Sequence, residues 1–146
     1  MIEAISGVGR LYVDANILIY LFEENAAFYE NVAAAFGLAQ QLGTKILTCE
    51  ITVTECLNGA YRIKNLELAK LYLDMLGDQN FITLIPIHLA TCIGAARLSA
   101  GQGLKTIDAL HLASSIAGEC DAFLTNDLRF KTNESIRIIQ LSQFNK

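Results

Sequence analysis

The sequence has little of what builds a zinc site or a disulfide framework. Only two of its 146 residues are histidine and four are cysteine, and no two cysteines form a C-x-x-C pair. A structural zinc site needs closer ligand spacing than this. We therefore expect the cysteines to be reduced and mostly buried as small apolar residues. They are Cys49, Cys56, Cys92 and Cys120.

Long apolar runs are also lacking. No stretch of the sequence approaches the ~20 apolar residues that a helix needs to cross a bilayer. Residues 1–10 have neither the basic start nor the apolar stretch of a signal peptide. The sequence therefore predicts a cytoplasmic protein that does not associate with membranes. With 53% apolar and 18% charged residues, we expect one globular domain over residues 1–146.

An excess of basic residues, which is common in nucleic-acid-binding proteins, is missing as well. The formal net charge is -4 at pH 7. Four acidic residues discussed below account for this negative net charge, and bound divalent cations would offset their charges. The remainder of the chain is neutral, so the charge neither excludes nor indicates an RNA substrate.

Short apolar segments alternate with segments in which apolar residues recur at helical spacing. This alternation predicts an α/β fold, a three-layer α/β/α sandwich with a central, mainly parallel sheet. The expected strands are residues 11–13, 45–48, 81–85, 122–124 and 136–139. The expected helices are residues 16–23, 26–42, 50–63, 66–76, 88–100 and 106–117, the last with Thr106 as its N-cap.

Acidic residues stand where such a sheet binds ligands, at the carboxyl ends of its strands. Asp14 follows the first strand, Asp127 follows the fourth, and Asp108 lies in the first turn of a helix that starts at this edge. Glu55, inside the helix expected over 50–63, could reach the edge from the side. We therefore expect these carboxylates to converge.

Each acid also has an ordinary structural explanation. Asp14 is suited to cap a helix, Asp108 to interact with a helix dipole, and Asp127 to form a turn. Glu55 could belong to a solvated helix face. These alternatives stay open for single residues, but convergence of all four on one edge is harder to explain structurally.

Converging carboxylates require a cation, because they raise one another's pKa by repulsion. Mg²⁺ and Mn²⁺ prefer oxygen ligands. One such ion can acidify a bound water, and a second can stabilise a leaving oxygen. This chemistry suits hydrolysis of a phosphodiester without a covalent nucleophile. The sequence offers no Ser–His or Cys–His arrangement that would favour covalent catalysis.

Four segments, in this order, resemble the successive motifs of PIN-domain nucleases, most closely the VapC-type toxins of toxin–antitoxin pairs. They read VDAN at 13–16, TEC at 54–56, GLKTIDALHLA at 103–113 and LTND at 124–127. The third is the most specific, and the order and separation of all four strengthen the match. The resemblance differs at Ser99, Gln102 and Ile107, where many relatives carry basic, aromatic and proline residues, but no difference removes a ligand.

The resemblance implies an α/β/α sandwich and an endoribonuclease that depends on Mg²⁺ or Mn²⁺. It also implies a homodimer and a small antitoxin that covers the acidic groove. Matched by position, the catalytic and metal-binding acids would be Asp14, Glu55, Asp108 and Asp127. Asn16 and Thr125 would support them, and Asn126 matches a more variable position.

Other residues and functions are alternatives. His111, one helical turn after Asp108, could be a general base, although a packing or supporting role is favoured. Lys105, Arg129 and Lys131 could bind RNA phosphates or be solvated surface charges.

The chain could instead be a non-catalytic RNA- or protein-binding module on the same fold. An Asp-nucleophile phosphatase is disfavoured, because its second acid would stand at residue 16, which is asparagine.

Overall fold

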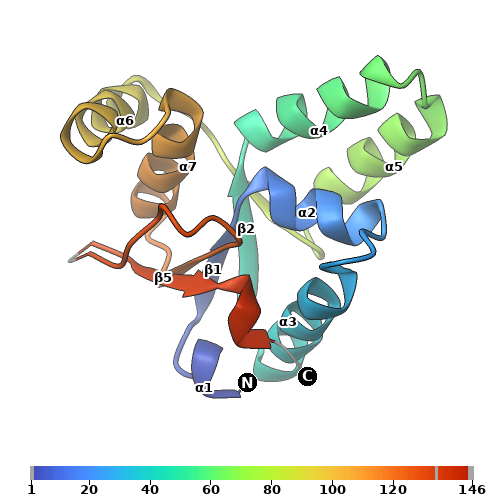
Figure 1. Ribbon diagram of the computed structural model, residues 1–146, viewed down its shortest axis with the longest axis horizontal. Coiled ribbons are helices and arrows are strands. Elements are labelled where there is room, and N and C mark those ends of the chain that lie inside the picture. The colour runs from blue at the N-terminus through green and yellow to red at the C-terminus, as the bar shows by residue number, and fades with distance from the viewer. Residues whose placement is uncertain (1, 134, 145–146) are drawn as a thin grey trace.

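In the computed structural model, which describes residues 2–133 and 135–144, five parallel strands form a single sheet (Figure 1). The strands are β1 (Arg10–Val13), β2 (Lys45–Cys49), β3 (Thr83–Ile85), β4 (Ala122–Thr125) and β5 (Arg137–Gln140). The helices are α1 (Ile2–Ile5), α2 (Ala15–Phe22), α3 (Tyr29–Leu42), α4 (Ile51–Arg62), α5 (Leu66–Leu76), α6 (Leu89–Gln102) and α7 (Thr106–Ala117). A 3₁₀ helix, η1, covers Leu141–Phe144. The expected α/β fold with a parallel sheet is confirmed.

The strand order β3-β2-β1-β4-β5 creates a switch point in the middle of the sheet. From β1 the chain adds β2 and then β3 on one side, and it returns to place β4 and β5 on the other side. In open α/β sheets, the crevice for ligands opens at the carboxyl ends of the strands where this reversal occurs. Here that crevice lies between the ends of β1 and β4.

Helices cover both faces of the sheet and bury two apolar clusters (Figure 1). Leu11 and Val13 of β1 pack with α1–α5 on one face, whereas Tyr12 packs with α6 and α7 on the other. This division follows from the alternation of side chains along a strand. Residues 11–13 of β1 are therefore buried from both sides, as their apolar sequence requires in a parallel sheet.

Some element boundaries differ from the sequence-based expectation. The helix expected from residue 26 begins at Tyr29, and the residues before it form a turn in which the Asn25 side chain accepts the amides of Ala27 and Phe28 at 2.9 and 3.1 Å. The strand expected from residue 81 begins at Thr83, since residues 78–82 form a hydrogen-bonded turn. Neither α1 nor η1 was expected from the sequence.

The predicted N-cap at Thr106 is wrong. Thr106 is the first residue of α7, and the extended residue before the helix is Lys105, whose side chain makes no capping hydrogen bond. The cysteines are all free, as expected, and three of them are buried, but Cys92 is exposed. In the described part of the chain, no helix has both the length and the apolarity that crossing a membrane requires.

Candidate active site

Asp14 occupies the switch point, because it is the first residue after β1. Its side chain is only 8% exposed, and its Oδ1 accepts the backbone amide of Ile17 at 3.2 Å. Asp14 is therefore the N-cap of α2, the ordinary structural role that the sequence also allowed for it. A single hydrogen bond to one of its oxygens leaves lone pairs for another ligand.

Thr125, the last residue of β4, connects the two strand ends. Its buried hydroxyl donates to Oδ2 of Asp14 at 2.8 Å and accepts the backbone amide of Asp127 at 3.1 Å. Burial raises the pKa of Asp14 above its ordinary value, although the hydrogen bond from Thr125 opposes the shift. A cation in front of Asp14 would relieve the cost of this buried charge.

Asp127 and Asp108 lie on either side of the Arg129 guanidinium. The Nη2 of Arg129 donates to Oδ2 of Asp108 at 2.9 Å and also to Oδ2 of Asp127, while its Nε donates to both oxygens of Asp127 at 3.0 Å. Hydrogen bonds from Arg129 hold the pKa of Asp127 below its ordinary value. Two acids that are 19 positions apart in the sequence thus face one place, occupied here by a protein cation.

These side chains line one hollow of about 410 Å³. Three of the four expected acids contribute to it, together with the three expected supporting residues. The lining includes Asp14, Asp108, Asp127, Asn16, Thr125 and Asn126. The structure therefore brings together six of the seven residues that the sequence singled out, at the switch point of the sheet.

Glu55 lies beside this hollow rather than in its lining. Its Oε1 contacts Nε2 of His111 at 2.6 Å, and Nδ1 of the same ring contacts the Tyr12 hydroxyl at 2.6 Å. Glu55 is thus turned toward the sheet, and its charge raises the pKa of Asp14. The side chain is 34% exposed, so it also borders solvent. The alternative of a fully solvated helix face is wrong.

His111 is a buried supporting residue in α7 rather than an exposed base. Burial lowers its pKa, but contacts with Cys49 and Glu55 outweigh burial and raise the pKa to about 10. The ring is therefore positively charged near neutral pH and forms an ion pair with Glu55. A charged imidazole that is already bonded at both nitrogens cannot take a proton from a substrate, which agrees with the favoured supporting role.

The donor chemistry of the hollow fits Mg²⁺ or Mn²⁺. Asp14, Asp108 and Asp127 offer only oxygen, and Mg²⁺ needs just one or two carboxylates because it keeps several waters. Within residues 2–133 and 135–144, however, no three acidic, histidine or cysteine side chains are drawn together closely enough to hold a metal ion. The contacts of Arg129 take up oxygens that such an ion would use.

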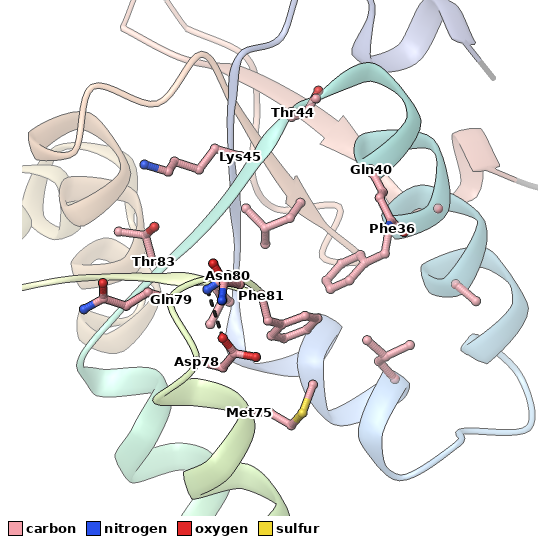
Figure 2. Close-up of a pocket in the computed structure, with 16 residues that line it drawn as sticks. Phe36, Gln40, Thr44, Lys45, Met75, Asp78, Gln79, Asn80, Phe81 and Thr83 are labelled. Carbon is pink, nitrogen blue, oxygen red and sulfur yellow. Dashed lines mark hydrogen bonds between the residues drawn. The ribbon is translucent and has the colours of Figure 1, made fainter.

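A larger hollow than this one lies elsewhere. It has a volume of about 760 Å³ and lies between α3, β2 and the segment that joins α5 to β3. Figure 2 shows Phe36 and Phe81 beside each other in this hollow, and Asp78 hydrogen-bonded to the amide of Asn80. Its walls carry no pair of facing acids, so the smaller hollow at the switch point is the candidate active site.

Comparison with protein families decides the relationship that the motifs suggested. The family model of the PIN domain matches residues 11–134, which include every candidate site residue. The chain belongs to the PIN domain family. A comparison with curated protein sequences found no match.

Solved structures share this PIN fold at low sequence identity. VapBC2 from Rickettsia felis, bound to a DNA fragment from its promoter, matches with a TM-score of 0.69 and 19% identity over 90% of this chain and 98% of the other. A toxin–antitoxin complex from Klebsiella pneumoniae matches with a TM-score of 0.64 and 20% identity, over 86% of this chain and 94% of the other. DNA-bound VapBC from Salmonella typhimurium matches with a TM-score of 0.67 and 16% identity, over 90% of this chain and 98% of the other.

Sequence reasoning missed two features of this site. It treated Arg129 as a phosphate contact or a surface charge, whereas Arg129 joins Asp108 to Asp127. It placed Tyr12 in the core or at a subunit interface and did not connect it with the site, whereas the buried Tyr12 hydroxyl contacts His111. The first feature had a sequence signal, since an arginine two positions after an acid in a turn can fold back onto it. The second had none, because Tyr12 and His111 are distant in the sequence.

Proposed function

We propose that this chain is an endoribonuclease that hydrolyses RNA phosphodiester bonds with Mg²⁺ or Mn²⁺, and that it is the toxin of a toxin–antitoxin pair. One observation carries the proposal. Asp14, Asp108 and Asp127 come from three separate segments, after β1, in α7 and after β4, and face one hollow at the switch point of the sheet. Structural roles alone would not require this convergence.

Membership of the PIN domain family supports nuclease activity. The toxin assignment is supported by fold similarity to the VapBC and toxin–antitoxin complexes. Those structures are toxin–antitoxin assemblies, so the corresponding partner proposed here is a small antitoxin that covers the acidic hollow. A homodimer is part of the same proposal.

Asp14, Asp108 and Asp127 would hold the metal. Glu55, the fourth expected metal-binding acid, would contribute its carboxylate from the side of the hollow. When bound, the ion supplies charge stabilisation for the phosphate and a more acidic water. Thr125 fixes one oxygen of Asp14 and the backbone before Asp127, so both carboxylates keep their orientation. His111 likewise fixes the orientation of Glu55, because its Nε2 contacts one carboxylate oxygen of Glu55. The chain's own contribution is a set of oriented carboxylates.

The test measures cleavage of labelled single-stranded and hairpin RNA by the purified protein. EDTA should abolish cleavage and Mn²⁺ or Mg²⁺ should restore it. Asp14→Asn should lower the rate by a factor of about 100 or more, since the neutral amide cannot replace a carboxylate ligand. Circular dichroism would show that the variant still folds.

Asp74→Asn is the matched control. Asp74 is an exposed residue of α5 that pairs with Lys70 on the surface, and the same loss of one charge there should leave the rate unchanged. Cleavage that persists in EDTA, or that Asp14→Asn retains at the rate of Asp74→Asn, would contradict the proposal.

A non-catalytic RNA- or protein-binding module is the second candidate. The observation in its favour is the Arg129 guanidinium, which already neutralises Asp108 and Asp127. This candidate predicts RNA or protein binding that is indifferent to EDTA, with no cleavage product at any metal concentration.

A further inference from the structure

Arg129 holds two of the proposed metal ligands at once. Its Nη2 lies 2.9 Å from Oδ2 of Asp108 and also contacts Oδ2 of Asp127, and its Nε lies 3.0 Å from each Asp127 oxygen. The backbone amide of Arg129 adds a further hydrogen bond to Asp127 at 2.9 Å. A single guanidinium therefore engages three carboxylate oxygens on two different elements.

The guanidinium nitrogen stands where a cation shared by the two aspartates would stand. Carboxylates bound to Mg²⁺ approach it to about 2.0–2.1 Å, so the nitrogen between them leaves no room for a second positive centre. Repulsion between a divalent ion and the guanidinium would add to this conflict. Asp14 is held differently, by Thr125 and the amide of Ile17.

The arginine can leave without disturbing the fold. Its side chain is 52% exposed, and the contacts above join it to the acids rather than to the buried apolar clusters. Ion pairs that border solvent are weak, so a divalent ion can replace this one. Release would cost the guanidinium little, because water can solvate it at the rim of the hollow.

We infer that Arg129 is an internal counter-ion, which keeps Asp108 and Asp127 together in the metal-free protein and which a divalent cation must displace to bind. This inference rests on the proposed function, since it assumes that the two aspartates are metal ligands. It assigns Arg129 a role in setting the affinity for metal. The consequence is a site that binds its ion more weakly than its carboxylates alone would allow.

The test compares Mn²⁺ binding to the wild type, Arg129→Gln and Lys105→Gln, followed by electron paramagnetic resonance at low ionic strength. Both variants lose one positive charge near Asp127, because Lys105 also lowers the pKa of that carboxyl through its charge. Only Arg129→Gln removes the guanidinium between the aspartates. We expect Arg129→Gln to bind Mn²⁺ roughly tenfold more tightly than the wild type, and Lys105→Gln to change the affinity by less than about threefold.

Nuclear magnetic resonance gives a second, direct measurement. The Nε–H signal of Arg129, assigned by its loss in Arg129→Gln, should shift and exchange faster with water when Mg²⁺ saturates the wild-type protein. An unchanged signal at saturation would overturn the inference. So would equal or weaker Mn²⁺ binding by Arg129→Gln compared with Lys105→Gln, while the wild type still binds the ion. If no variant binds Mn²⁺, the metal-dependent function itself fails, and that result is distinct.

Discussion

At the scale of single residues, the candidate site depends on one hydroxyl group. Thr125 donates to Asp14 and accepts the amide of Asp127, so it aligns two carboxylates that follow different strands. A hydrogen bond to a charged group contributes roughly 1.5–3 kcal/mol. Because Thr125 is fully buried, water cannot replace the hydroxyl when it is removed.

Thr125→Val should therefore lower the metal-dependent RNA cleavage rate by about tenfold or more, since about 1.4 kcal/mol corresponds to one factor of ten. The valine has nearly the same shape but leaves Asp14 without its donor. Thr125→Ser keeps the hydroxyl and should stay within about threefold of the wild type. Steady-state cleavage rates at saturating Mn²⁺ would measure both, and equal rates in the two variants would contradict this role.

The sequence predicted the positions of the candidate acids at the sheet edge better than it predicted the residues that contact them. Asp14 and Asp127 follow directly from the rule that parallel strands end at a common edge. The orientation of Glu55 could not be predicted, because a residue within a helix can face either way until its neighbours are known. Its neighbour proved to be His111, which is 56 positions away and recognisable only in the folded chain.

At the scale of helices and strands, glycine determines where α3 stops. Gly43 follows the helix with φ of +70°, a left-handed conformation that costs other residues about 1–2 kcal/mol. Gly37 lies within the same helix on its exposed side, and a Cβ there meets nothing within 4 Å. Replacing these two glycines by alanine should therefore change the free energy of unfolding in opposite directions.

Gly43→Ala should lower the free energy of unfolding by about 1–2 kcal/mol, because alanine is strained at a positive φ. Gly37→Ala should raise it by about 0.5–1 kcal/mol, because alanine restricts the unfolded chain and favours the helix. Urea unfolding followed by circular dichroism would measure both changes. A shift in the same direction for the two variants would contradict this explanation of the helix end.

Elements with strong periodic patterns were predictable, and those fixed by side-chain hydrogen bonds were not. α5 was expected over 66–76 and is observed over Leu66–Leu76, since apolar spacing and a following glycine define it. The start of α3 was misplaced because a turn, in which the Asn25 side chain accepts the amides of Ala27 and Phe28, precedes the helix that begins at Tyr29. α1 and η1 are single short turns, and four residues are too few to show a period.

At the scale of the whole molecule, metal binding should appear as added stability. An ion that binds only the folded chain stabilises it by about 2.7 kcal/mol at a concentration 100 times its dissociation constant. For a chain of this length that corresponds to a rise of roughly 5–10 °C in the melting temperature. Thermal unfolding of the wild type with and without Mn²⁺ would measure the rise.

The same measurement on Asp14→Asn supplies the control. The variant can melt at a different temperature in the absence of metal, because a buried carboxylate has been replaced. The relevant quantity is the rise on adding Mn²⁺, which should largely disappear. A full rise in the variant would mean that the ion binds somewhere other than the switch point.

The position of β1 in the middle of the sheet has a consequence for the cell that makes this protein. Asp14 lies near the start of the chain, but the hydroxyl that orients it arrives 111 residues later, on the strand beside β1. A chain still attached to a ribosome therefore carries a first strand without its neighbour. Domains fold as the chain emerges from its N-terminal end, so this site can assemble only after Thr125 has left the ribosome. Until β4 has emerged and paired with β1, the nascent chain carries Asp14 without the hydroxyl that orients it.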